Sequence, residues 1–334
     1  MNQALLTRLF KTIEGDKSTP LIKVAYSIIE DEKKKGHLNL ADRLNAILKI
    51  NTENFDSQEF KKVLKPIKSN VIKIPLDRRY QLPLATHIEH DFLRREMVLS
   101  KSVESKIIRI EKEHLARERL KHHGLKSRKK ILFYGSSGCG KSMAAEKIAW
   151  DLGLPFYKVR FDTIISSYLG ESAANLQKLF QSAEDFPCVL LLDEFDIIGK
   201  QRGSNSKDVG EIHRIVNILL GLLEEYDGEG ILIATTNLEG SLDDALFRRF
   251  DDFIELPRPS EAEIAILLEQ SLSALRLNKN IDLGNYAKKL LGMSYAIVVK
   301  IATDAAKKTI INSHNEISAQ DLDSAFEENK VINR

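Results

Sequence analysis

Eight consecutive residues in the middle of the chain have the types and spacing of a phosphate-binding loop. They fit the pattern G-x-x-x-x-G-K-[ST], whose glycines let backbone N–H groups wrap a phosphate, while the helix that begins there adds the positive end of its dipole. Lys141 would reach the β- and γ-phosphates of a nucleoside triphosphate, and the Ser142 hydroxyl would ligate Mg²⁺. The residues of this predicted site are Gly135, Ser136, Ser137, Gly138, Cys139, Gly140, Lys141 and Ser142, with Met143 directly behind them.

Two adjacent carboxylates, Asp193 and Glu194, follow the apolar run 189–192. At the end of a buried strand Asp193 could hold Mg²⁺ through water, because a metal at a triphosphate needs a carboxylate there. Glu194 points in a different direction and could polarise the attacking water as a general base. A strand that runs into a surface turn gives the same pattern, but the phosphate loop upstream favours the catalytic interpretation.

Three polar residues farther along could complete such a site. Asn237 ends the apolar run 231–236, and a polar residue at the end of a central parallel strand lies in the ligand crevice, where its amide could orient the water. Arg248 and Arg249 could stabilise the charge on a transferring phosphoryl group, often one bound to a neighbouring protein. By composition alone, an arginine pair is also typical of a solvated or salt-bridged surface.

The elements that must position these residues alternate between strands and helices from residue 131 onward. The apolar runs are too continuous for half-exposed strands, so they predict an α/β fold with a parallel sheet covered by helices on both faces. The expected strands are 131–134, 156–160, 189–192 and 231–235, and the expected helices are 141–152, 176–183 and 212–223. After Pro257 and Pro259 the strand signals stop, and helices are expected at 261–275, 283–291, 294–312 and 318–329.

The first hundred residues differ from this pattern. Apolar residues recur at helical spacing through residues 1–50, with Pro20 at a helix start and Gly36 at a stop. Prolines and the alternating segment 71–74 then predict a short strand in a linker, and a long helix is expected over 102–122. We therefore expect an N-terminal helical module at 1–65, a linker with short strands at 66–101, an α/β core at 102–257 and an α-helical lid at 258–334.

The composition is that of an ordinary globular protein. Hydrophobic residues make up 43% and charged residues 29%, with a mean hydropathy of −0.24, and no apolar stretch reaches the ~20 residues of a membrane span. The first residues show no secretory signal. Two cysteines, Cys139 and Cys188, cannot form a disulfide framework and lack metal-ligand spacing. We expect a reduced, cytoplasmic protein with no membrane partner.

The net charge of +2 hides an asymmetry along the chain. Residues 1–130 carry 29 Lys and Arg against 17 Asp and Glu, whereas the remaining residues carry 21 against 31. A basic first part could meet nucleic acid or an acidic partner. Solvated helix faces and pairing between subunits are the favoured explanation, because no dense basic block with interleaved aromatic residues is present.

Four ordered motifs resemble those of the AAA clade of AAA+ ATPases: GSSGCGKS, VLLLDE, IATTN and LDDALFRRFDDFIELPRPS. The likeness runs from about Leu115 to the end of the chain and is greatest to small single-ring, bacterial-type AAA proteins with a katanin- or spastin-like core. It implies a P-loop NTPase sheet with a C-terminal four-helix lid, ATP and Mg²⁺ as ligands, and a ring, usually a hexamer. It also implies that Asn237 is the sensor-1 residue and that Arg248 and Arg249 are arginine fingers acting on the next subunit's γ-phosphate.

Other segments resemble parts of the same clade less fully. The segment 166–172 is similar to the first pore loop of protein-translocating members, which implies that Tyr168 and Leu169 grip an extended polypeptide; a half-exposed loop aromatic is the alternative. Gly124 and Leu125 lie where family members pack adenine. The segment 292–296 resembles the start of a lid helix, although no arginine stands there for a sensor-2 role. The phosphate loop departs from the family at Ser136, Ser137 and Cys139.

The resemblance favours an ATP-hydrolysing homo-oligomeric ring that remodels, unfolds or translocates protein substrates through a central pore. A nucleic-acid motor or loader with the same ATPase fold is an alternative, supported only by the basic first part of the chain. A third possibility is a ring that activates a partner enzyme without threading. Neither H-E-x-x-H nor G-x-S-x-G occurs, so no protease motif is evident.

Overall fold

The computed structural model describes residues 74–77, 80–165, 171–195, 209–237, 248–278, 281–314 and 316–330, with isolated positions between 25 and 45. The chain divides into two units, Met1–Asn70 and Val71–Arg334. In the first unit the described positions are all helical, and Ala25, Ile29, Ala41 and Leu44 are buried. Most of the predicted N-terminal helical module therefore lies outside the described residues.

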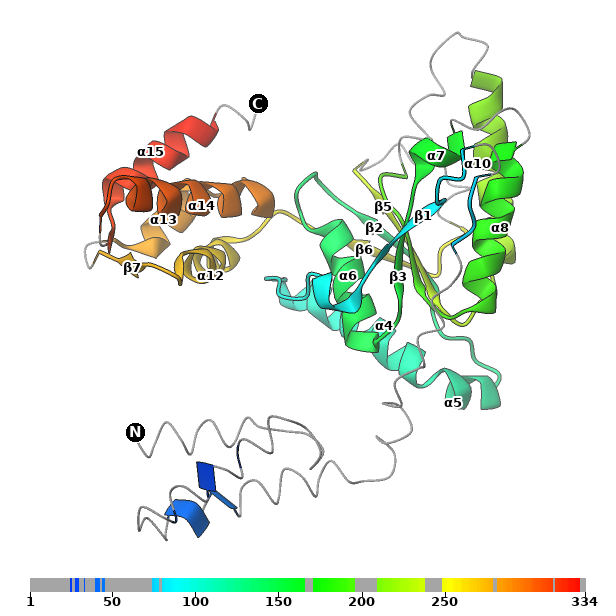
Figure 1. Ribbon diagram of the computed structural model, residues 1–334, viewed down its shortest axis with the longest axis horizontal. Helices are drawn as coiled ribbons and strands as arrows, with labels where there is room; N and C mark the ends of the chain where they lie inside the picture. The colour runs from blue at the N-terminus through cyan, green and yellow to red at the C-terminus, as the bar shows by residue number, and fades with distance from the viewer. Residues whose placement is uncertain are drawn as a thin grey trace. The chain divides into compact units, whose positions relative to one another are not determined.

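The second unit is built on a six-stranded sheet (Figure 1). The strands are β1 (Ala85–Ile88), β2 (Lys130–Tyr134), β3 (Phe156–Val159), β4 (Val189–Leu192), β5 (Ile231–Thr236) and β6 (Asp252–Glu255), in the order β1-β3-β4-β5-β2-β6. All neighbours are parallel except β1, which pairs antiparallel with β3. The predicted α/β fold with a parallel sheet is confirmed, and its central strands lie within one residue of the expected ranges.

Helices cover both faces of this sheet (Figure 1). Side chains along each strand alternate between the faces: Val189 and Leu191 pack with α4 (Lys101–Leu115) and α6 (Lys141–Leu152). Leu190 and Leu192 pack with α8 (Glu171–Asp185) and α10 (Val209–Glu225), near which lies α7 (Phe161–Ile165). Two apolar cores thus hold the carboxyl ends of the central strands in a fixed arrangement.

Two expected features at the start of the second unit differ in the structure. The helix expected over 102–122 is interrupted at Ala116, where α4 ends and α5 (Arg117–His122) begins. There Arg117 donates a side-chain hydrogen bond to the carbonyl of His114, which satisfies a group that a continuous helix would have used. Of the strand expected at 71–74, only Ile74 is described, and it is not in a strand. The observed strand in the linker is β1, which is followed by a short 3-10 turn, His90–Phe92.

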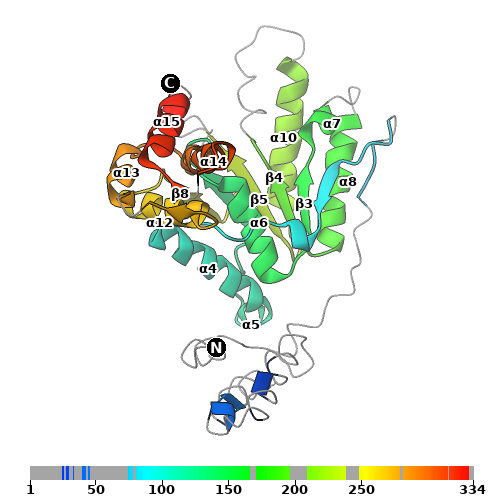
Figure 2. The same ribbon diagram turned by 60° about the vertical axis from the view of Figure 1, so that its left-hand side comes forward.

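The C-terminal part is helical, as expected, and has an apolar core of its own (Figure 2). Its helices are α12 (Glu261–Leu272), α13 (Leu283–Lys289), α14 (Tyr295–Ile311) and α15 (Ala319–Lys330). The start of α12 is fixed by a capping box between Ser260 and Glu263. The expectation of no strands here was wrong, because β7 (Arg276–Leu277) and β8 (Glu316–Ile317) pair in parallel. Two-residue strands are too short to show a period in the sequence.

Candidate active site

The predicted phosphate loop connects β2 to α6, as the mechanism requires. Gly135, Gly138 and Gly140 all have positive φ angles, of 134°, 76° and 85°. These conformations favour glycine, and a Cβ atom at Gly135 would lie 2.4 Å from the carbonyl oxygen of Leu256. The loop therefore has the glycines that its backbone path needs, at the N-terminus of a twelve-residue helix.

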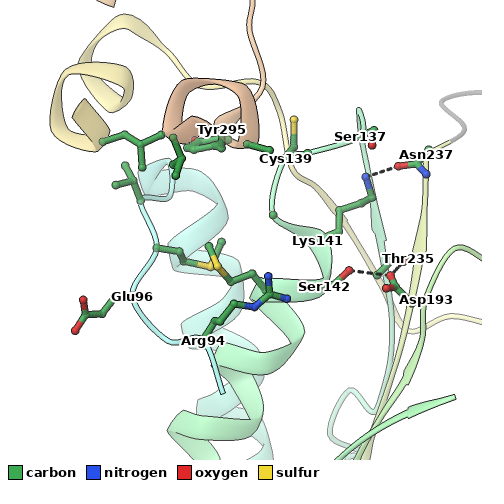
Figure 3. A pocket seen from close by; sticks show the side chains of 18 of the residues that line it. Arg94, Glu96, Ser137, Cys139, Lys141, Ser142, Asp193, Thr235, Asn237 and Tyr295 are labelled. Atoms are coloured by element: carbon green, nitrogen blue, oxygen red, sulfur yellow. Dashed lines mark hydrogen bonds between the residues drawn. The ribbon is translucent and has the colours of Figure 1, made fainter. Parts of the chain in front are cut away.

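The Lys141 side chain closes the loop onto the end of β5 (Figure 3). Its ammonium group donates hydrogen bonds to the carbonyl oxygens of Gly135 and Ser136, at 2.7 and 2.9 Å. A third hydrogen bond runs to Oδ1 of Asn237, also at 2.7 Å. Lys141 is buried, so its charge is held at one point by oxygen atoms from two segments that are about a hundred residues apart in the sequence.

The Asp193 carboxylate lies at the end of β4 within hydrogen-bond reach of three side chains. Its Oδ1 accepts hydrogen bonds from the hydroxyls of Ser142 and Thr235, at 2.8 and 2.6 Å, and its Oδ2 lies 2.5 Å from the ammonium of Lys158. Burial opposes ionisation of Asp193, but the three hydrogen bonds outweigh it and hold the pKa of Asp193 below its usual value. The carboxylate is therefore negative at neutral pH.

These oxygen atoms suit a hard divalent cation such as Mg²⁺. Among the residues that the structure describes, no three His, Cys, Asp or Glu side chains gather at one place. A metal beside the loop would therefore take its protein oxygens from Ser142 and Asp193 and the rest from a nucleotide and water, which is the usual pattern for Mg²⁺ at a triphosphate. The chemistry of the donor set fits the predicted metal.

The second carboxylate, Glu194, is in a different environment from Asp193. Glu194 is exposed and has a φ of 53°, whereas Asp193 is half-buried. The Glu194 backbone N–H donates a hydrogen bond to the hydroxyl of Thr235 at 2.9 Å, and the next N–H, of Phe195, donates to the Thr235 carbonyl at 2.8 Å. Thr235 thus fixes the turn that directs the two carboxylates differently.

A cavity of about 690 Å³ opens above the loop. One end carries Lys141, Ser142, Asp193, Glu194, Thr235 and Asn237; the other is apolar, with Met97, Val98, Leu267, Tyr295 and Val299. The apolar end is formed by the segment before α4 together with α12 and α14. A nucleotide has the same division, with a charged triphosphate and a flat base.

Two predicted base-binding residues are not part of this cavity. Gly124 and Leu125 follow the end of α5 and are both exposed, and they do not line it. The break at Ala116 and the separate helix α5 place them elsewhere. Met97 and Val98 take the position beside the apolar end instead. Sequence reasoning missed them because this short apolar stretch belongs to no motif.

Tyr295 brings the lid to the loop. Its hydroxyl donates a hydrogen bond to Glu263 at 3.1 Å, and the next residue, Ala296, donates its N–H to the carbonyl of Gly138 at 3.1 Å. Burial and the neighbouring Glu263 carboxylate raise the pKa of Tyr295, so the phenol stays protonated. An aromatic ring of the lid thus lines the cavity beside the phosphate loop (Figure 3).

Contacts between Arg94 and Glu146 hold the segment before α4, which forms part of the apolar end of the cavity. The Glu146 side chain on α6 is buried and accepts hydrogen bonds from the backbone N–H of Arg94 at 3.0 Å and from its Nε at 2.8 Å. A paired guanidinium is what a buried carboxylate requires. Nothing in the sequence pattern pointed to this pair.

The predicted arginine fingers do not line the cavity of their own chain. Arg248 is exposed, and Arg249 is partly buried with its Nε 3.3 Å from Glu224 on α10.

The predicted pore residues, Tyr168 and Leu169, lie outside the described residues. Cys139 is buried within the loop, and burial raises the pKa of the other thiol, Cys188, to about 12.

Comparison with known proteins assigns the class that this fold and site define. Residues 131–258 match the ATPase family associated with various cellular activities (AAA). The chain is 35% identical over 305 residues to the uncharacterized AAA family ATPase y4kL of Sinorhizobium fredii, which covers 91% of this chain and 89% of that protein. It belongs to the AAA family, as its motifs predict, and it is an ATP hydrolase.

More distant relatives are much longer proteins. The chain is 33% identical over 210 residues to the peroxisomal ATPase PEX6 of Debaryomyces hansenii and 42% identical over 139 residues to that of Candida glabrata. These matches cover 59% and 40% of this chain but only 18% and 14% of the relatives. Among the described helices, none is both long and apolar enough to span a bilayer.

Proposed function

We propose that the cavity holds ATP with its base between Met97, Val98 and Tyr295 and its triphosphate on the loop. Lys141 binds the β- and γ-phosphates, with the N–H groups of residues 137–143 around them. Ser142 and Asp193 hold Mg²⁺, which neutralises charge developing on the phosphates. The observation that carries this assignment is that Lys141 and Ser142, at the start of α6, contact Asn237 and Asp193, which directly follow the neighbouring parallel strands β5 and β4.

Hydrolysis is assigned to Glu194 and Asn237. Glu194 is exposed at the cavity and acts as the general base toward water, while the Asn237 amide orients that water beside the γ-phosphate. Asp193 serves the metal and stays ionised because three side chains stabilise its charge. One turn, fixed by Thr235, therefore gives the two adjacent carboxylates separate tasks.

Arg248 and Arg249 complete the site of a neighbouring subunit. Both lie outside the cavity of their own chain, and guanidinium groups supplied in trans stabilise a transferring phosphoryl group. This arrangement requires a closed ring with heterologous contacts, and we propose a homohexamer. We retain the division into a core at 102–257 and a lid at 258–334, which the separate apolar core of the lid supports.

The ring acts on polypeptides. Support comes from the resemblance of the segment around Tyr168 and Leu169 to a translocating pore loop. The test is to purify a Glu194→Gln variant in ATP and to identify what it retains. We expect the variant to retain a polypeptide in an ATP-dependent manner. A Lys141→Ala, Glu194→Gln double variant should not retain this polypeptide, and adding Tyr168→Ala to Glu194→Gln should also abolish its retention.

Two other results would replace this proposal. Retention of DNA or RNA that is lost at higher salt would favour the nucleic-acid motor. Retention of one folded enzyme, whose capture does not depend on Tyr168, would favour an activating ring that does not thread its partner.

A further inference from the structure

Lys158 is a charged residue at the carboxyl end of a strand that is otherwise apolar. Its neighbours Phe156, Tyr157 and Val159 are buried, whereas the Lys158 side chain is 45% exposed. In the register of the sheet Lys158 lies opposite Leu191, and Asp193 follows two residues later. Residues two apart along β4 share a face, so Lys158 and Asp193 lie on the same side of the sheet, toward α6.

The Lys158 ammonium is 2.5 Å from Oδ2 of Asp193, whose side chain is 13% exposed. The other carboxylate oxygen, Oδ1, accepts from the Ser142 and Thr235 hydroxyls. Both oxygens of the carboxylate assigned to the metal are therefore engaged, one by hydroxyl groups and one by a full positive charge. A cation held by Ser142 and Asp193 shares this carboxylate with Lys158.

We propose that Lys158 is a resident counter-cation that weakens Mg²⁺ binding at Asp193 and turns Oδ1 of that carboxylate toward Ser142. This inference rests on the proposed nucleotide site and adds a positioning residue to it. Lys158 does not itself line the cavity, but its ammonium contacts Asp193, which does, so its action on the metal runs through that carboxylate. The ring would then need more free Mg²⁺ to load its nucleotide and would release Mg²⁺-bound product more readily.

The size of the effect follows from charge and exposure. Two positive charges on one carboxylate repel each other, and one of them is divalent. Because nearly half of the Lys158 side chain is in water, solvent screens much of this repulsion. A Coulomb estimate at aqueous dielectric over about 6 Å gives roughly a tenfold change in Mg²⁺ affinity when the ammonium is removed.

A merely structural tether between β3 and β4 would behave differently. Loss of such a tether would loosen the turn at Asp193 and weaken Mg²⁺ binding or leave it unchanged. The counter-cation role predicts instead that loss of the Lys158 charge strengthens Mg²⁺ binding. The sign of the change in metal affinity therefore separates the two roles without reference to catalytic rate.

The experiment measures Mg²⁺ binding in a Glu194→Gln background, where turnover is blocked. A fluorescent ADP analogue is held at constant concentration and MgCl₂ is titrated at constant ionic strength. Lys158→Gln is expected to lower the Mg²⁺ concentration at half-saturation about tenfold. Lys158→Arg, which keeps the charge, should stay within about twofold of the parent. Lys289→Gln, which breaks the lid pair with Asp323, should leave the titration unchanged.

An unchanged or raised Mg²⁺ half-point in Lys158→Gln overturns the inference. Thermal unfolding of each variant confirms that the chain is folded, and Lys158→Arg reports on the charge even where Lys158→Gln is less stable. A parent that binds nucleotide without any dependence on Mg²⁺, or fails to bind it, overturns the proposed site itself. The two failures are thus distinguishable.

Discussion

The ammonium of Lys141 and the amide oxygen of Asn237 are 2.7 Å apart. This contact joins the start of α6 to the end of β5. Lys141, assigned to the phosphates, and Asn237, assigned to the attacking water, are therefore held in a fixed position relative to each other. The position of the Lys141 ammonium is thereby tied directly to that of the Asn237 amide. Because the two residues are assigned different roles, substitution of one of them can distinguish an effect on ATP affinity from an effect on kcat.

Substitution of Asn237 by Ala should slow hydrolysis much more than it weakens ATP binding. Lys141 keeps its carbonyl partners at Gly135 and Ser136, so the phosphate site survives, while the water loses its orienting amide. We expect kcat to fall by roughly 10²-fold and the affinity for ATP to change by no more than a few fold. Steady-state kinetics and equilibrium nucleotide binding measure the two quantities. Asn312→Ala, at an exposed helix end, is the matched control.

Substitution of Glu194 by Gln should preserve ATP binding and assembly but abolish turnover. The amide cannot accept a proton from water, and Glu194 is exposed, so the change has little effect on packing. We expect a loss of at least about 10²-fold in kcat. Glu225→Gln, an exposed residue at the end of α10, should retain full activity. Undiminished ATPase activity in Glu194→Gln would remove this residue as the base.

Substitution of Tyr295 by Ala should weaken nucleotide binding. The ring lines the apolar end of the cavity, and an aromatic face in contact with a base contributes on the order of 1–3 kcal/mol. We expect an increase in the dissociation constant of about tenfold or more for both ATP and ADP. Tyr295→Phe keeps the ring and loses only the hydrogen bond to Glu263, so it should bind nearly as well. Equal binding by the Ala and wild-type proteins would show that the ring does not contact the base.

His114 should make the folded state sensitive to mild acid. Burial, with Arg117 and Lys129 nearby, lowers the pKa of His114 to about 4, whereas an unfolded histidine titrates near 6.5. The unfolded state therefore binds a proton first, and stability is full above pH 6.5, falls as the pH drops toward 4, and levels off below. The total loss is about 3 kcal/mol.

Urea unfolding between pH 7.5 and 4 measures this loss. His114→Gln should flatten the pH dependence of the unfolding free energy over this window, whereas the exposed His123→Gln should leave it unchanged. An identical pH profile in the wild type and His114→Gln would assign the acid sensitivity to other groups.

The sequence predicted the centre of the molecule well because its signals there are strong and local. The glycines of the loop dictate a turn, and continuous apolar runs dictate buried strands, so β4 and α6 were placed at their observed bounds. β1 and β6 were missed because each is short and only partly buried. The break at Ala116 was missed because the helical period continues across it.

The parts of the site that the sequence did not reveal depend on contacts between distant segments. Thr235 and Lys158 converge on Asp193 from separate strands, and Arg94 reaches Glu146 across 52 positions. One signal was available for Lys158, namely a lone charge in an apolar strand. For Thr235 the only signal was a polar residue close to Asn237. Gly124 and Leu125 were assigned by transferring a family position, and they follow a helical segment that the structure breaks at Ala116.

The most direct test of the account mixes two inactive variants. Glu194→Gln subunits retain Arg248 and Arg249, and Arg248→Ala, Arg249→Ala subunits retain Glu194, so an active site exists only where the second kind receives arginines from the first. Random rings from an equal mixture should recover up to about a quarter of wild-type ATPase activity. Activity no greater than the sum of the separate variants, at concentrations where wild-type rings form, would contradict completion of the site by a neighbouring subunit.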